Sequence, residues 1–160
     1  MVDSPALIHC VRFNLGDLVC AIDASQVQEV LRKLETTPVP GAPDFVTGIV
    51  SFRGAMLEVM DLGLRLGLGR AQASEQSRII VTRADDDNVG LLVDDVLDVL
   101  PVDPARLQQG ATLGVPAAAV DYIQSRIIGQ EQEMNLLDLH RLIDDSVAMH
   151  ERKPARGGDL

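Results

Sequence analysis

The residues best suited to catalysis or metal binding are few in this sequence, and they are widely separated. The histidines are His9, His140 and His150, and the cysteines are Cys10 and Cys20. Zinc sites need several such ligands at short, regular spacings, which these residues do not have. Both cysteines lie in apolar alternating stretches, where a free Cys usually packs as a small hydrophobe. We therefore predict no metal site, no cofactor and no catalytic residue, and hence a protein that is not an enzyme.

Three aspartates, Asp94, Asp95 and Asp98, are the strongest remaining candidates for acid–base chemistry. Paired carboxylates act as acid and base only where a cleft raises the pKa of one of them. A small barrel hydrolase or a ligand-binding barrel is therefore an alternative function. It requires the three side chains to converge in a deep pocket, and side chains that cap turns or face solvent would exclude it.

Phosphate and nucleic-acid binding are disfavoured by composition. The formal net charge is -10, aromatic residues make up 2% of the chain, and Trp is absent, whereas nucleic-acid binders use basic and stacking residues. Gly63, Gly67 and Gly69 do not have the order of a dinucleotide-binding turn. The acidic run from Asp85 to Asn88 lacks the alternating ligands of a calcium loop and predicts a solvated hairpin turn. We expect no nucleic-acid partner.

The length of 160 residues is that of one ordinary domain. Residues Met1 to Ala6 lack the basic and apolar regions of a signal peptide. The longest apolar stretch, Val89 to Val102, contains aspartates and is too short to span a bilayer. We expect a cytoplasmic protein with no direct insertion into a membrane.

The hydrophobic pattern predicts mostly β-structure. Gly16-Asp17 predicts a hairpin turn between two apolar runs, and Asp23 predicts the cap of a short helical turn that leads into a strand. Arg53-Gly54 predicts a second hairpin turn, and Asp138 predicts the start of a C-terminal helix. The strands expected from this pattern are 11–15, 18–22, 45–52, 55–62, 78–83, 89–93, 122–128 and 134–137. A loop is expected from Gly63 to Ser77, and residues 151–160 are expected to form a disordered tail.

One sequence unit occurs twice. Ile22-Asp23 followed by Val27 to Leu31 is similar to Val93-Asp94 followed by Val96 to Leu100. Each copy has the end of a strand, an Asp, and then Val, any residue, an acid, Val and Leu. Two copies can arise by chance, but a true repeat would give two similar lobes.

The segment from Thr37 to Gly69 resembles the CheW family, whose members share a Pro-rich start, a Gly-containing strand, an Arg-Gly turn and a following strand that ends in Asp-Leu. The residues that match are Pro40, Pro43, Gly48, Arg53, Gly54, Asp61 and Leu62, and the resemblance extends from about Leu7 to Ile143. It implies one domain, 7–147, of two intertwined five-stranded barrels similar to SH3 barrels, with short helices and a C-terminal helix. The implied lobes are roughly 16–75 and 7–15 plus 78–147, with a hydrophobic groove between them.

The resemblance also implies the function. CheW-like proteins are non-enzymatic adaptors in chemotaxis; they bind the regulatory domain of a CheA-type histidine kinase through the ends of the barrels. They receive the cytoplasmic tip of a chemoreceptor in the groove, which recruits them from the cytoplasm to membrane receptor arrays.

The site residues that the resemblance implies are Glu29 and Arg53, paired near the receptor-facing surface, with Gly54 in the same turn and Val27 as an apolar contact. The alternatives are an ion pair that is only structural and a Val27 that is only part of the core. Phe52 and Glu58 depart from the family pattern, so a related system such as pilus motility is an alternative pathway.

Overall fold

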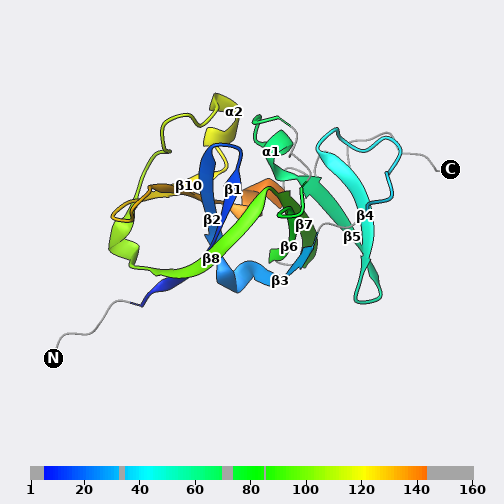
Figure 1. Cartoon of the computed structure of the whole chain (residues 1–160), viewed down its shortest axis with the longest axis horizontal. Helices are drawn as coiled ribbons and strands as arrows, with labels where there is room; N and C mark the ends of the chain where they lie inside the picture. The colour runs from blue at the N-terminus through cyan, green and yellow to red at the C-terminus, as the bar shows by residue number, and fades with distance from the viewer. Residues whose placement is uncertain (1–5, 33–34, 70–73, 85, 144–160) are drawn as a thin grey trace.

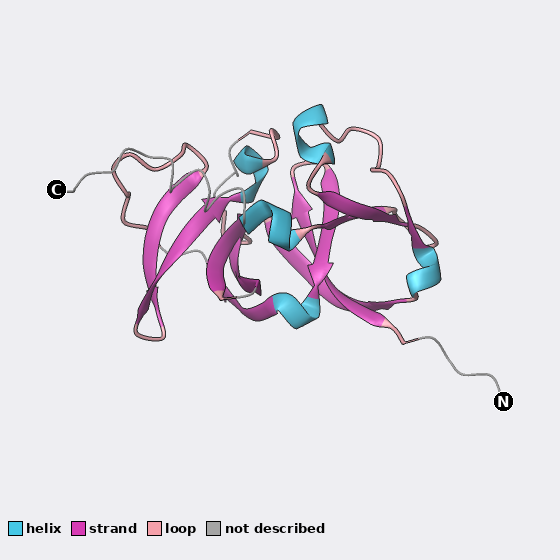
Figure 2. Cartoon of the chain, turned by 180° about the vertical axis from the view of Figure 1, so that it is seen from behind, coloured by secondary structure: helices cyan, strands magenta, loops and turns pink. Residues whose placement is uncertain are grey.

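The computed structural model describes residues 6–32, 35–69, 74–84 and 86–143, and these residues form eleven strands in two sheets. The strands are β1 (Ile8–Leu15), β2 (Leu18–Asp23), β3 (Val27–Arg32), β4 (Val46–Phe52), β5 (Ala55–Asp61), β6 (Arg78–Ala84), β7 (Asp87–Val93), β8 (Asp95–Val102), β9 (Leu107–Gln108), β10 (Ile123–Ile127) and β11 (Met134–Leu137). The short helices are η1 (Ala24–Gln26), α1 (Leu62–Arg65), η2 (Pro104–Arg106) and α2 (Ala117–Val120). Figure 2 shows that these helices lie in the connections between strands. The predicted mostly-β class is confirmed, and the predicted tail at 151–160 lies outside the described residues.

The two sheets lie side by side (Figure 1). One has six strands in the order β8-β1-β2-β11-β10-β9, and the other has five in the order β3-β6-β7-β5-β4. The resemblance implied two five-stranded barrels; the first sheet has a sixth strand, β9, and no pairing between described strands closes either sheet into a barrel.

The sheets divide the chain differently from the lobes expected at 16–75 and at 7–15 plus 78–147. Strand β2 pairs with β1 in the six-stranded sheet, whereas β6 pairs with β3 and β7 pairs with β5 in the five-stranded sheet. The physical reason is that a two-residue turn keeps both strands of a hairpin in one sheet. The chain therefore passes between the sheets after the hairpins, from β2 to β3 and again from β7 to β8.

The strand order confirms the internal repeat in the topology. Reading β8-β1-β2-β11-β10 against β3-β6-β7-β5-β4 gives the same sequence of antiparallel, antiparallel, parallel and antiparallel pairs. Each copy has a bulge at the equivalent place, between Val46 and Gly48 in β4 and between Ile123 and Ser125 in β10. Because bulges are specific local features, their equivalence supports two related lobes.

The two copies meet around Arg65. The amide of Asp61 donates to the carbonyl of Phe45 at 2.7 Å, and the amide of Asp138 donates to the carbonyl of Tyr122 at 2.8 Å, so these pairs are equivalent. The Arg65 guanidinium lies 4.8 Å from the ring centroid of Phe45 and 4.4 Å from that of Tyr122. Its Nη2 also donates to the Tyr122 hydroxyl at 2.6 Å. Arg65 thus links equivalent aromatic residues of the two lobes by cation–π contacts.

Three apolar clusters form the core. One lies within the six-stranded sheet and includes Cys10 and Ile127, and one lies within the five-stranded sheet and includes Val59 and Ile79. The largest cluster contains residues from both sheets, among them Phe13, and joins the two lobes. Each sheet therefore buries one face in its own lobe and the other between the lobes, which gives the lobes a shared source of hydrophobic stabilisation.

Local sequence explains most of the connections. The Asp23 carboxylate accepts from the Ser25 amide at 2.9 Å, which confirms the predicted cap of a helical turn before β3. The loop predicted after Asp61 begins instead with α1, because the Asp61 carboxylate accepts from the Leu64 amide at 3.1 Å. Residues 139–143 are helical after Asp138, as predicted. Among the described helices, none is long and apolar enough to cross a membrane.

Candidate functional site

The turn between β4 and β5 presents the first predicted site residues. Arg53 has φ +51° and Gly54 has φ +80°, and two positive φ values in a two-residue loop define a type I′ hairpin turn. Gly adopts this conformation readily, whereas for Arg it costs roughly 1 kcal/mol. The predicted Arg-Gly turn is therefore present, and it holds Arg53 in a strained conformation between the paired residues Phe52 and Ala55.

Glu29 lies close to this turn although β3 and β4 are at opposite edges of the five-stranded sheet. The Arg53 Nη2 atom donates to Glu29 Oε1 at 2.8 Å, and the two side chains are 67% and 39% exposed. The guanidinium also lies 5.0 Å from the centroid of the Phe52 ring. A pair of this exposure contributes only about 0–1 kcal/mol to stability, so its main effect is to orient the guanidinium at the surface.

Val27 precedes Glu29 by two residues, and a bulge in β3 separates them. The side chain is half-buried and packs against the cluster between the lobes. Of the four predicted site residues, Glu29, Arg53 and Gly54 thus meet at one exposed corner. Val27, on the same strand as Glu29, is half-buried and packs against the cluster that joins the lobes.

A second acid–arginine pair has its acid at the equivalent position of the other lobe, and sequence reasoning did not identify it. Its arginine, Arg12, aligns with Val81 of β6 and not with Arg53. Arg12 Nε donates to Asp98 Oδ1 at 2.9 Å, and Arg12 Nη2 donates to Oδ2 at 2.7 Å. These hydrogen bonds raise the pKa of Arg12, against the lowering effect of burial. The repeat aligns Asp98 with Glu29. This alignment was the signal available in the sequence, because it indicates that Asp98 could also pair with an arginine.

Two exposed valines follow the paired acids. Val30 is 39% exposed and Val99 is 58% exposed. Their neighbours across the strands are Ile80 and Val11, which are buried in the cluster between the lobes. At both valines the core between the lobes therefore reaches the surface. They are candidate contacts for a partner protein, and the sequence pattern alone did not distinguish them from core residues.

The three aspartates considered for acid–base chemistry do not converge. The Asp94 carboxylate accepts from the Gly16 amide at 2.6 Å and holds the β1–β2 turn. Asp98 is paired with Arg12 at the surface, and Asp95 lies opposite Asn14 in the ladder. The hollow at the junction of the lobes, of about 320 Å³, is lined by other residues, namely Gly16, Asp17, Leu18, Leu68, Leu113 and Gly114. The condition set for a hydrolase is therefore not met.

The cysteines behave as core residues. Burial raises the pKa of Cys10 to about 11 and that of Cys20 to about 12, so both remain thiols at neutral pH and are poor nucleophiles and ligands. The two lie in different apolar clusters. Within the described part of the chain, no group of three or more His, Cys, Asp or Glu residues could hold a metal ion.

Comparison with known proteins gives a match to the family model of the CheW-like domain over residues 9–147. The chain is 36% identical over 98 residues to the chemotaxis protein CheW of Rhizobium meliloti, which is 61% of this chain and 63% of that protein. It is 31% identical over 134 residues to the protein FrzA of Myxococcus xanthus, which is 82% of each.

Among solved structures, the scaffolding protein TtCheW from Thermoanaerobacter tengcongensis superposes with a TM-score of 0.77 at 27% identity. The superposition covers 89% of this chain and 91% of that protein. The similarity therefore includes both sheets and the connections between them.

Proposed function

The chain belongs to the CheW family, and from this membership we propose that it is a non-enzymatic adaptor that couples chemoreceptors to a CheA-type histidine kinase. The observation that carries the proposal is the exposed Glu29–Arg53 pair, with its 2.8 Å bond, on a strained turn. A chain gains little stability from such a pair. A strained conformation that stability does not require is typical of a functional surface.

The receptor-binding part of the proposal is supported by the chemistry of this corner. Arg53 offers a planar set of donors that suits a carboxylate or a carbonyl of a receptor tip. The exposed Val30, next to Glu29, and the half-buried Val27 supply apolar surface that continues into the core between the lobes. A charged anchor beside apolar contacts fits the anatomy of protein interfaces, in which a few residues dominate the binding energy.

The proposal also places kinase binding at the ends of the two sheets. It includes the inference that each lobe curves like a barrel. The ion pair between Glu29 and Arg53 supports this curvature, since it joins residues from the two edges of the five-stranded sheet. A separate apolar cluster within each sheet also supports it. The open ends of two such lobes would bind the regulatory domain of the kinase, and binding to both partners would recruit the protein from the cytoplasm to receptor arrays.

The direct test is a pull-down with purified partners and with cell lysate, comparing the wild-type protein with Arg53→Glu. We expect the wild type to retain a CheA-like kinase and a receptor, and the variant to lose most of the receptor while it keeps the kinase. Arg83→Glu is the matched control because Arg83 is an exposed arginine of the same sheet, with its side chain 58% exposed. Recovery of neither partner by the wild type would reject the adaptor function.

A charge-swapped variant, Glu29→Arg with Arg53→Glu, separates partner contact from a structural role. If the pair only holds the turn, the swap restores the ion pair and receptor binding. If Arg53 contacts the receptor, the swap restores the fold and leaves binding lost. We expect the second result.

The second candidate function is the same adaptor role in another chemosensory system, such as pilus motility. It is favoured by the similarity to FrzA, a relative whose name is not that of a chemotaxis CheW protein. Capture of a kinase and a receptor from a non-flagellar system in the same pull-down would support this candidate.

A further inference from the structure

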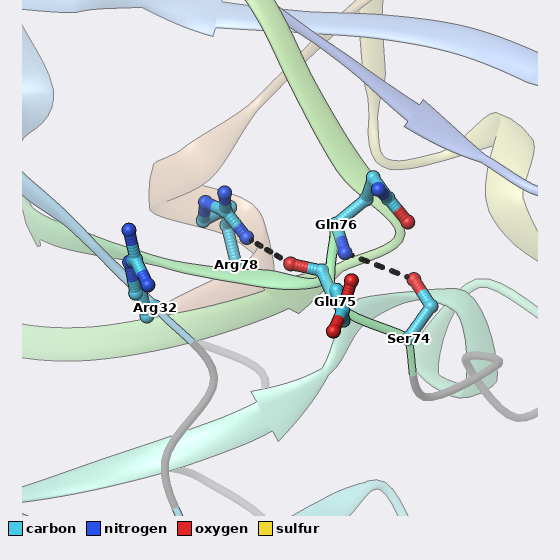
Figure 3. Close-up of a pocket in the computed structure, with 5 residues that line it drawn as sticks. All are labelled: Arg32, Ser74, Glu75, Gln76 and Arg78. Carbon is cyan, nitrogen blue, oxygen red and sulfur yellow. Dashed lines mark hydrogen bonds between the residues drawn. The ribbon is translucent and has the colours of Figure 1, made fainter.

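We propose that the hollow at the ends of β3 and β6 binds two carboxylates of an acidic helix in a partner protein, held by Arg32 and Arg78. The hollow has a volume of about 510 Å³ and is lined by Arg32, Ser74, Glu75, Gln76 and Arg78 (Figure 3). This site goes beyond the adaptor function, which uses the corner formed by Glu29 and Arg53.

The two arginines are directly opposite each other in the β3–β6 ladder. Like charges in this position repel and destabilise a strand pair. Neither Arg32 nor Arg78 forms an ion pair with an acidic side chain among the described residues, whereas Arg12, Arg53 and Arg126 each do. The juxtaposition therefore concentrates unneutralised positive charge at one place on a chain whose net charge is -10.

The local structure orients the Arg78 side chain. Its Nη1 atom donates to the carbonyl of Glu75 at 2.7 Å and to that of Ser77 at 2.8 Å. The loop that supplies these carbonyls is itself held, because the Ser74 amide donates to Ser77 Oγ and the Gln76 amide donates to Ser74 Oγ, both at 3.1 Å. Only Nη1 is used in these bonds, so Nη2 and Nε remain available to a ligand.

Arg32 has no hydrogen-bond partner in the described part of the chain, and its side chain points in the same direction as that of Arg78 (Figure 3). The Glu75 carboxylate is directed away from the two guanidinium groups (Figure 3). The acid that lines the hollow therefore leaves the two arginines open to an incoming anion.

The spacing of the arginines selects the kind of partner. Cβ atoms of directly opposed residues in an antiparallel pair are about 4.5–5.5 Å apart. Residues three or four apart on a helix have Cβ atoms about 5–6 Å apart, so two glutamates one helical turn apart match the two guanidinium groups. A single small anion would make fewer contacts with the two arginines than two carboxylates would, because each carboxylate can form a bidentate contact with one guanidinium group.

The test is an NMR titration of the full chain that follows the Nε–Hε signals of its arginines. The probes are a helical peptide with two glutamates four residues apart, the same peptide with glutamines, and inorganic phosphate. We expect the glutamate peptide to shift the signals of Arg32 and Arg78 in a saturable way that weakens as salt is added. Arg32→Gln should weaken binding about threefold, as expected for the loss of one exposed charge-assisted contact.

Arg83→Gln is the matched control, because Arg83 lies on the same strand as Arg78 and away from the hollow. This variant should bind the peptide as tightly as the wild type does. Equal shifts with the glutamine peptide, or equal weakening by Arg83→Gln, would overturn the proposal. Binding of phosphate without binding of the glutamate peptide would also overturn it, since the hollow would then hold a small anion. The result does not depend on recovery of a kinase or a receptor, so it is independent of the test of the adaptor function.

Discussion

The two lobes place an acid at the same point of a repeated fold, Asp98 in one and Glu29 in the other, and pair it with arginines from different elements. Asp98 and Arg12 are neighbours across adjacent strands, with two hydrogen bonds and side chains that are 47% and 26% exposed. Glu29 and Arg53 come from opposite edges of a sheet and share one bond near a strained turn. The Asp98–Arg12 pair therefore joins two strands of one sheet, while the Glu29–Arg53 pair leaves its arginine 67% exposed at the surface.

The largest expected effect concerns the core that the two lobes share. Phe13 is fully buried in the cluster between the lobes, and its equivalent in the other lobe is Thr82, which donates to the carbonyl of Val89 at 2.8 Å. Phe13→Ala should lower the free energy of unfolding by about 3–5 kcal/mol because it leaves a cavity. Thr82→Ala should cost about 1 kcal/mol through the loss of one hydrogen bond.

Urea denaturation followed by circular dichroism and by the fluorescence of Tyr122 measures both effects. Because the core is shared, we expect one cooperative transition for each variant, with both signals changing together. Two separated transitions in Phe13→Ala would show that the lobes fold independently and would contradict the common core.

The limits of sequence-based prediction follow from the same comparison. The hairpins were predicted because their turns, Gly16-Asp17 and Arg53-Gly54, are local signals. The lobe boundaries were predicted incorrectly, because they separated β2 from β1, its partner in a local hairpin, and because the pairing of β6 with β3 joins residues distant in the sequence. Helix α1 was missed because it has four residues and Gly63 weakens any helical pattern.

The candidate site shows the same division between local and distant information. The Glu29–Arg53 pair was implied by the family resemblance, and the structure brings the two side chains together. The Arg12–Asp98 pair joins residues that are 86 positions apart. Its acid was visible in the repeated unit, but no local pattern indicated which arginine would face it.

The two acid–arginine pairs should contribute differently to stability. Asp98→Asn should lower the free energy of unfolding by about 1 kcal/mol, since it removes a two-bond pair with a partly buried arginine. Glu29→Gln should change stability by only about 0–0.5 kcal/mol, because that pair is more exposed and has one bond. Denaturation midpoints at low and at high salt measure both values, and Asp98→Asn should be the more destabilised variant in each. Equal decreases in the free energy of unfolding would show that the two pairs do not differ in their contribution to stability.

The smallest expected effect is on the strained turn, where stability and binding should change in opposite directions. Arg53→Gly relieves a positive φ of +51°, which should raise stability by roughly 0.5–1 kcal/mol, and the lost ion pair offsets about 0–0.5 kcal/mol of this gain. Receptor recovery in the pull-down should fall at the same time, because the guanidinium is gone while the turn remains.

Arg12→Gly is the corresponding change in the other acid–arginine pair. It should be clearly destabilising, since Arg12 lies within a strand and loses both its hydrogen bonds. If the Arg53→Gly variant were destabilised and still bound receptor, Arg53 would serve stability in the five-stranded lobe as Arg12 does in the six-stranded lobe. The assignment of different roles to the two pairs would then be wrong.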